Sequence, residues 1–251
     1  MSRYEITFNI LRKLEETLKS KKQGITYDTF MKEIMNVENT PIENAKKVAG
    51  NHIHGDLRFM EKDEKIHLRT PDYGINLLKN EEFIVFDLET TGIGVGQNKI
   101  TEIGCVKIKN GEIIDKFETL VNPEMEISER VTKITGITND MVKSAPSIKD
   151  TLNSFSEFIK DTPLVAHNAS FDIAFINYER KLLDMVLLTN PLICSVKLAH
   201  KAIPELNKYN LDILAEHFNI TIENRHRSMG DVLATTTVFN ELRKIYLEKF
   251  D

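Results

Sequence analysis

The segment FIVFDLETTG, residues 83–92, places two carboxylates at the end of an apolar run. Residues 83–86 are all apolar, which predicts a strand that is covered on both faces. Side chains alternate along a strand, so Asp87 and Glu89 lie on the same face with their Cα atoms about 7 Å apart. Unpaired carboxylates at a buried strand end are costly. On this segment alone, a metal site and an exposed edge strand with two solvated acids remain open.

Two later segments supply further polar side chains. LVAHNASFD, residues 164–172, passes from an apolar strand into a helix whose first turn contains Asp172. RHRSMGD, residues 225–231, places His226 in a loop five residues before Asp231, which begins a long helix. Each acid alone also suits helix capping or the helix dipole, and His226 alone suits a surface position.

Carboxylates gathered from these segments would form a site of hard oxygen ligands. Such ligands suit Mg²⁺ or Mn²⁺. Two such ions about 4 Å apart can activate a water and stabilise the leaving oxygen of a phosphodiester. The combined segments therefore point to metal-dependent hydrolysis of nucleic acid.

The order and spacing of the three segments resemble the DEDDh branch of the DEDD 3′–5′ exonuclease superfamily. Its motifs are Asp-x-Glu, an Asp at the head of a helix, and His-x-x-x-x-Asp. The resemblance covers residues 82–247 and is closest to the proofreading exonucleases of bacterial DNA polymerase III, through FDLETTG, KITGIT at 133–138 and VAHNASFD at 165–172. It implies an RNase H-like fold and two Mg²⁺ or Mn²⁺ ions. The implied metal ligands are Asp87, Glu89, Asp172 and Asp231.

The resemblance also implies roles for other residues. His226 would be the general base, because a neutral imidazole can take a proton from water near physiological pH. Nucleoside 5′-monophosphates would be released. The residues implied near the 3′-terminal nucleotide are Leu88, Thr90, Thr91, His167, Asn168 and Phe171. For the apolar pair, Leu88 and Phe171, packing in the core is an equally good interpretation.

The pattern of residues 82–251 predicts an α/β domain with a mixed sheet flanked by helices. Strands are expected at 83–89, 100–109 and 112–121, the last two joined by a tight hairpin at Asn110-Gly111. Short strands at 163–166 and 192–194 then alternate with helices. The expected helices cover residues 148–159, 171–183, 196–202, 211–218 and 231–250.

Residues 1–75 predict a small accessory domain that is winged-helix-like. Apolar spacing indicates helices at 6–18, at 28–35 and from Pro41 onward, followed by short strands at 57–60 and 66–69. Polar residues and Pro71 interrupt the pattern at 72–82, which we interpret as the linker. Such a domain could bind DNA, a polymerase or another protein; its nearly balanced charge weakens the DNA interpretation.

The composition limits the remaining choices. The net charge of −5 excludes a simple basic DNA-coating protein. Cys105 and Cys194 are the only cysteines, which makes a disulfide framework improbable and suggests a cytoplasmic setting. No stretch approaches the roughly 20 apolar residues of a membrane span, so no membrane association is expected.

The sequence thus predicts a 3′–5′ exonuclease that acts on single-stranded or frayed DNA ends in proofreading, repair or end processing. One alternative is an exoribonuclease of the same branch, because the motifs do not reveal tolerance of a 2′-OH. The other is a non-catalytic nucleic-acid-binding scaffold. A scaffold would be expected to have lost motif acids, and all are present.

Overall fold

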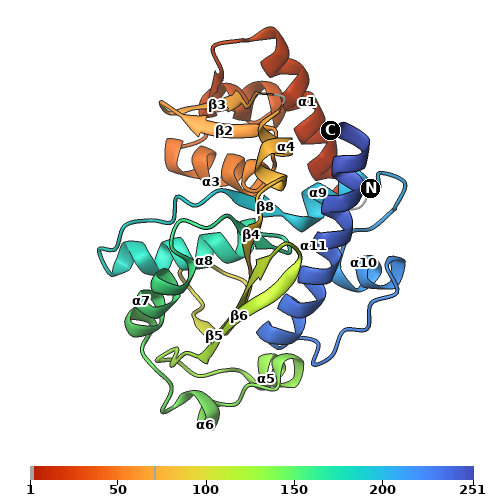
Figure 1. Cartoon of the computed structure of the whole chain (residues 1–251). Helices are drawn as coiled ribbons and strands as arrows, with labels where there is room; N and C mark the ends of the chain where they lie inside the picture. The colour runs from red at the N-terminus through yellow and green to blue at the C-terminus, as the bar shows by residue number, and fades with distance from the viewer. Residues whose placement is uncertain (1–2, 71) are drawn as a thin grey trace.

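A five-stranded mixed sheet forms the centre of the computed structural model, which describes residues 3–70 and 72–251. The strand order is β6-β5-β4-β7-β8 (Figure 1). β5 pairs antiparallel with β4 and β6, whereas β7 runs parallel to β4 and β8. The predicted mixed sheet is therefore confirmed. The strands are β4 (Glu82–Thr90), β5 (Ile100–Lys109), β6 (Glu112–Leu120), β7 (Leu164–Ala166) and β8 (Leu192–Cys194).

The hairpin between β5 and β6 turns at the predicted dipeptide. Asn110 and Gly111 have φ values of 52° and 86°, as a type I′ turn requires. β4 lies inside the sheet between β5 and β7, and residues 83–86 are fully buried. The apolar run before Asp87 therefore belongs to a buried strand, which removes the exposed edge strand from the alternatives.

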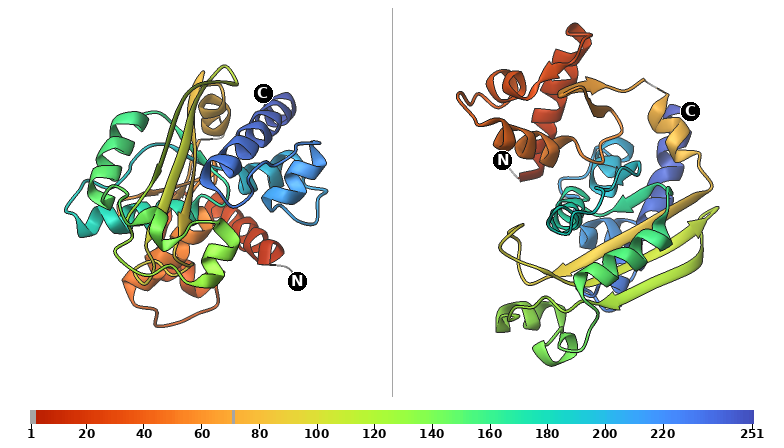
Figure 2. Two further views of the ribbon diagram at one scale, coloured as in Figure 1. Left: turned by 90° about the horizontal axis from the view of Figure 1, so that it is seen from below. Right: turned by 90° about the vertical axis from the view of Figure 1, so that its left-hand side faces the viewer.

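Helices cover both faces of this sheet. Figure 2 (left) shows the sheet nearly edge-on, with α7 and α8 on one side and α10 and α11 on the other. α11 packs across β4 and β5, so its first turn lies close to the sheet. The helices after the sheet begins are α5 (Glu129–Thr135), α6 (Asn139–Val142), α7 (Ile148–Ile159), α8 (Ser170–Leu182), α9 (Ser195–Ala202), α10 (Leu211–His217) and α11 (Ser228–Phe250).

The N-terminal region has a hydrophobic core of its own, from Leu11 to Ile66. Its three helical segments and its hairpin are present as predicted, but a third short strand makes the sheet order β1-β3-β2. The winged-helix-like assignment stays a prediction. The elements are α1 (Arg3–Ser20), β1 (Ile25–Thr26), α2 (Tyr27–Thr29), the π-helix η1 (Phe30–Ile34), α3 (Ile42–Ile53), β2 (Phe59–Lys62) and β3 (Lys65–Leu68).

A short helix, α4 (Tyr73–Leu78), occupies the segment that we interpreted as a linker. Leu77 and Leu78 are buried in the core of the sheet, and α4 contacts α11. The residues around this helix are mostly polar, so the sequence pattern did not indicate a helix with two buried leucines. The division into domains 1–75 and 82–251 stays our proposal, supported by the two separate cores.

The N-terminal region docks on the edge strand β8. The backbone amide of Cys194 donates to the carbonyl of Gly55 over 2.9 Å. Gly55 has a φ of +74°, and a Cβ built on it would lie 2.7 Å from the Cβ of Cys194, so only glycine fits. Lys197 also donates from Nζ to the carbonyl of His54. These contacts fix the two regions against each other and cover part of an open sheet edge.

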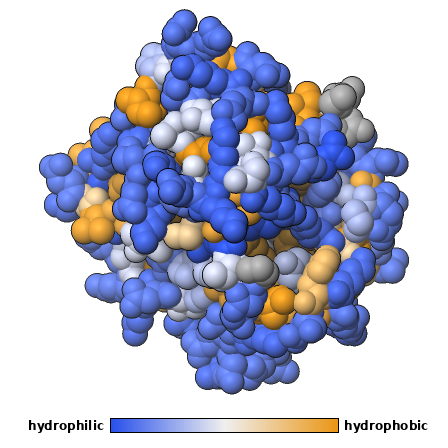
Figure 3. All heavy atoms as spheres, turned by 90° about the horizontal axis from the view of Figure 1, so that it is seen from above, coloured by the Kyte–Doolittle hydropathy of each residue, from blue (hydrophilic) through white to orange (hydrophobic). Residues whose placement is uncertain are grey.

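The surface on the side of the N-terminal region is mainly hydrophilic, with apolar side chains in small separate patches (Figure 3). None of the described helices has both the length and the apolar character needed to span a bilayer.

Candidate active site

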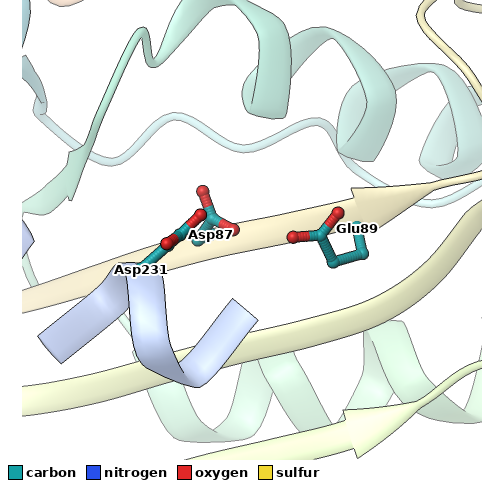
Figure 4. A group of neighbouring side chains, drawn as sticks. All are labelled: Asp87, Glu89 and Asp231. Carbon is teal, nitrogen blue, oxygen red and sulfur yellow. The ribbon is translucent and has the colours of Figure 1, made fainter. Parts of the chain in front are cut away.

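Three carboxylates from two elements meet at the end of the central strand. Asp87 and Glu89 extend from β4, and Asp231 extends from the first turn of α11 (Figure 4). One ligand atom of each residue lies within 4.8 Å of the other two. The packing of α11 across β4 therefore brings Asp231 next to two acids that lie 142 and 144 positions earlier in the sequence.

Asp172 reaches the same neighbourhood from the first turn of α8, where it is 2% exposed. It does not belong to the group of three atoms just described. Burial raises the pKa of Asp172 to about 8, although backbone hydrogen bonds from its own amide and from Leu88 act in the opposite direction. Burial, followed by the charges of Asp172, Glu89 and Asp231, raises the pKa of Asp87 well above its ordinary value.

The other two carboxylates are also poorly compensated. Burial and the charge of Asp231 raise the pKa of Glu89 to about 8, and burial raises that of Asp231. Within the described part of the chain, Oδ1 of Asp231 is buried and has no hydrogen-bond partner. An orphaned carboxylate oxygen among like charges is what a hard divalent cation would satisfy. The residues present therefore fit such an ion.

The guanidinium of Arg225 partly compensates this negative charge. Arg225 donates from Nη1 to Oδ2 of Asp231, and from Nε to Oδ1 of Asp212 over 2.8 Å. Its charge lowers the pKa of Asp87 and of Glu89, against the larger effect of burial. Arg225 is thus a cation held beside the candidate metal ligands by a carboxylate of α10, Asp212.

Replacing this arginine should strengthen metal binding. For Arg225→Gln we expect the affinity for Mn²⁺ to rise about three- to thirtyfold. The substitution removes a positive charge that competes with the metal ion for carboxylates that are partly exposed. Isothermal titration of the variant and the unaltered protein with Mn²⁺ at pH 7.5 measures this. Arg130→Gln, on the exposed helix α5, is the matched control. Unchanged or weaker binding would show that Arg225 supports the ligand geometry instead.

His226 lies in the loop that leads into α11. Its side chain is exposed, and its φ of +65° is uncommon for a residue other than glycine. Nη1 of Arg225 lies 3.3 Å from Nδ1 of His226, and both the backbone amide and the side chain of His226 act to lower the pKa of Asp231, against the larger effect of burial. The strained backbone thus holds the imidazole beside the carboxylate cluster, without making it one of the clustered ligand atoms.

A buried carboxylate of β5 anchors this loop from the other side. Glu102 is fully buried and accepts hydrogen bonds from Nε of Arg227 at 3.1 Å and from the backbone amide of Ser228 at 2.8 Å. The second contact satisfies a free amide at the start of α11. Glu102 therefore fixes the helix start that carries Asp231, and its charge also contributes to the raised pKa of Glu89.

Three of the residues predicted to contact substrate lie beside the acids of β4. Leu88 lies between Asp87 and Glu89, and Thr90 and Thr91 follow Glu89. Leu88 is 5% exposed and belongs to the main core. Thr90 donates from Oγ1 to the carbonyl of Gly92 over 2.7 Å. Oγ1 of Thr91 accepts from the amide of Lys99 over 3.0 Å. Both threonines thus shape the loop after β4, and the substrate contacts of all three stay predictions.

The other three lie in the loop after β7 and in the first turn of α8. His167 shares a hydrogen bond of 2.9 Å between Nδ1 and Oγ of Ser195, and burial lowers the pKa of His167 to about 4. Its imidazole is therefore neutral at physiological pH. Asn168 is exposed, with a φ of +64°. The half-buried ring of Phe171 lies tilted against Phe175, with 4.9 Å between the ring centroids. Their contacts with substrate stay predictions too.

Sequence reasoning missed Glu102, Asp212 and the two arginines. Arg225 and Arg227 flank His226 and were within the segment that we singled out, so their position was a usable signal. Their partners come from other elements: Glu102 of β5 lies 125 positions from Arg227, and Asp212 of α10 lies 13 positions from Arg225. Only the fold shows those pairs.

Comparison with known proteins places these residues in a family context. The RNase_T family model, described as exonuclease, matches residues 84–239. The chain is 42% identical over 173 residues to the PolC-type DNA polymerase III of Clostridium perfringens. The matched region covers 68% of this chain and 12% of that polymerase. The corresponding polymerase of Caldanaerobacter subterraneus subsp. tengcongensis is 46% identical over 158 residues, covering 63% and 11%. The chain thus spans only 11–12% of the length of these relatives.

Two solved exonuclease structures are also similar to this chain. Exonuclease X in complex with 5′ overhanging duplex DNA is 27% identical, with a TM-score of 0.54 over 64% of this chain and 91% of that one. E. coli exonuclease I in complex with a dA16 oligonucleotide has a TM-score of 0.59 at 17% identity, over 68% and 43%. The second likeness concerns the fold alone.

Proposed function

The chain belongs to the exonuclease family, and from this premise we propose that it is a metal-dependent 3′–5′ exonuclease. Its substrate would be single-stranded or frayed DNA 3′ ends, and its products nucleoside 5′-monophosphates. The relatives in which the matching region lies are DNA polymerases, which favours DNA over RNA. Proofreading, repair and end processing all fit this activity.

The observation that carries the proposal is the carboxylate cluster. Asp87, Glu89 and Asp231 each place a ligand atom within 4.8 Å of the others, and Oδ1 of Asp231 is buried without a partner in the described chain. Like charges gathered at this cost are typical of functional sites. Two Mg²⁺ or Mn²⁺ ions are the proposed cofactors, with Asp172 as the fourth ligand residue.

We assign the remaining steps to this chain's own side chains. A divalent ion held by the four acids would supply positive charge to the phosphoryl oxygens and lower the pKa of water. His226 would accept a proton from the attacking water at an imidazole nitrogen. Glu102 and Arg227 would keep the loop of His226 in place, while Arg225 and Asp212 would set the charge beside it.

Degradation of 5′-labelled single-stranded DNA and RNA of one sequence tests the proposal. The reactions contain Mg²⁺, Mn²⁺ or EDTA, with Asp231→Ala as the inactive control. We expect ladders that shorten from the 3′ end, require metal, are absent in the control and form faster on DNA. Faster shortening of RNA would favour the exoribonuclease. Intact label on both polymers would reject an autonomous nuclease and favour a scaffold that only binds.

The N-terminal region is proposed to connect the exonuclease with a partner. Its docking on β8 through Gly55 and Lys197 makes it a fixed attachment, not a loosely tethered one. A polymerase or another protein is the proposed partner. Location in the cytoplasm stays a prediction from the cysteine content.

A further inference from the structure

A cavity of about 330 Å³ lies between the N-terminal region and the far end of α11. It is lined by α1, the segment 56–58, residues 68–70, α9 and the last turns of α11. Tyr246, which lines it, is 15 residues beyond Asp231, about 22 Å along the helix. The cavity is thus separate from the carboxylate cluster. Ligand sites of this size commonly lie between domains.

Positive charge predominates in this cavity. Its lining includes five cationic side chains and two acidic ones, in a chain whose net charge is −5. The cationic residues are Lys19, Arg58, Arg69, Lys197 and Lys201. A second interdomain cavity, of about 480 Å³, contains Arg69 against Asp56 and Glu61 and has no such excess.

Both acids of the first cavity are already engaged by Arg58, and Glu15 also by Lys19 over 2.9 Å. Arg58 lies 2.5 Å from Oε2 of Glu15 and 2.7 Å from Oδ2 of Asp56. Lys201 approaches Glu15 only to 3.9 Å. The structure describes the side chains of residues 6–70 and 72–251. Among these, no carboxylate oxygen lies within 4.0 Å of a side-chain nitrogen of Lys197 or Arg69.

The unbalanced cations are held in place and partly removed from water. Lys197 is 8% exposed, and its Nζ donates to the carbonyl of His54. Arg69 donates from Nε to the carbonyl of Phe59 over 2.8 Å, with its guanidinium 3.9 Å from the ring centre of Tyr73. Burial and nearby Arg58 lower the pKa of Lys201. A bound anion would offset this charge.

An aromatic pair also lines the cavity. Tyr246 and Phe250 lie one helical turn apart, with ring centroids separated by 4.7 Å. Phe250 is 48% exposed, although it lines a cavity that also contains Leu57 and Leu198. Exposed aromatic rings of this kind stack on the planar faces of bases.

We propose that this cavity binds a nucleoside monophosphate, with the phosphate at Arg69, Lys197 and Lys201 and the base against Tyr246 and Phe250. The site combines cationic side chains and an aromatic pair in the lining of one cavity, and its volume suits a ligand that carries one base and one phosphate. The inference concerns binding and does not depend on the proposed hydrolysis.

Calorimetric titration of the full chain with dTMP tests the site. EDTA and the Asp87→Asn background remove metal-assisted binding at the carboxylate cluster. We expect saturable binding, weakened at least about fivefold by Lys201→Ala and at least about twentyfold by Arg69→Gln with Lys201→Ala, since each removes a charge-assisted contact. Lys149→Ala, an exposed lysine on α7, should bind as before.

Further ligands separate the two halves of the site. Phe250→Ala should weaken dTMP without changing the affinity for inorganic phosphate, because it removes only the proposed stacking ring. Deoxythymidine, which lacks the phosphate, should bind at least about tenfold more weakly than dTMP. Circular dichroism and thermal unfolding establish that each variant is folded.

Three outcomes would overturn the proposal. The first is no binding of dTMP at 1 mM concentration, taken as roughly the weakest affinity of interest. The second is binding that Lys201→Ala and Phe250→Ala both leave unchanged. The third is equal affinity for inorganic phosphate and dTMP. Nuclease assays of Lys201→Ala on labelled DNA run in parallel, so loss of nucleotide binding is distinguished from absence of hydrolysis.

Discussion

Asp87→Asn is expected to abolish hydrolysis and, at the same time, to stabilise the metal-free protein. Asparagine keeps the size of the side chain but removes one of the clustered negative charges. We expect hydrolysis of labelled DNA to fall by at least about 10³-fold, since catalysis by bound metal ions needs their ligands in place. In EDTA at pH 8, the free energy of unfolding should rise by about 1–3 kcal/mol.

The stabilising effect follows from the raised pKa values. Glu89 and Asp172 have pKa values raised to about 8, and that of Asp87 is also raised, whereas the same groups titrate near pH 4 in an unfolded chain. Between about pH 4 and pH 8 the folded chain therefore binds more protons than the unfolded chain. Stability contributed by these groups is fully present below pH 4 and is lost as the pH rises through 8.

Urea unfolding in EDTA at pH 5 and pH 8 measures both effects. The unaltered protein should lose stability over this interval, and Asp87→Asn should lose less, so that the two proteins differ most at pH 8. Mn²⁺ should restore the unaltered protein and have little effect on the variant. Asp161→Asn, at an exposed position, is the matched control. An Asp87→Asn protein that is less stable than the unaltered one at pH 8 would contradict this account.

The central sheet could be predicted because its signals are local. The apolar run at 83–86 needs two covered faces, and Asn110-Gly111 encodes its own turn through two positive φ values. Two of the elements that were missed depend on distant partners. β1 has two residues and exists through its pairing with β3, and α4 is anchored by Leu77 and Leu78 against the sheet.

The candidate site divides in the same way. The spacing of Asp87 and Glu89 on one strand face, and the starts of helices at Asp172 and Asp231, are readable in short segments. The pairs that adjust the charge and position of these acids are not. Glu102 meets Arg227 across 125 positions, and Asp212 meets Arg225 only because α10 packs against α11. A carboxylate in a strand gives no sequence signal of its cation when that cation comes from another element.

His226→Gln is expected to remove catalysis while leaving metal binding intact. Glutamine retains a polar side chain of similar length but cannot accept the proton of the attacking water. The turnover number should fall by about 10²- to 10⁴-fold, the usual contribution of a general base. Affinity for Mn²⁺ should stay within about twofold, because no nitrogen of His226 belongs to the described cluster of ligand atoms.

The contrast with Asp87→Asn makes the assignment specific. Single-turnover hydrolysis of 5′-labelled DNA and calorimetric titration with Mn²⁺ are measured on both variants, with His217→Gln, at an exposed position on α10, as the control. Loss of metal and activity together is expected for Asp87→Asn, and loss of activity alone for His226→Gln. If His226→Gln hydrolyses DNA within about threefold of the unaltered rate, the base is another group, because a lost general base costs far more. If it loses Mn²⁺ instead, the exposed loop of His226 serves the metal ligands through Asp231 and does not supply the base.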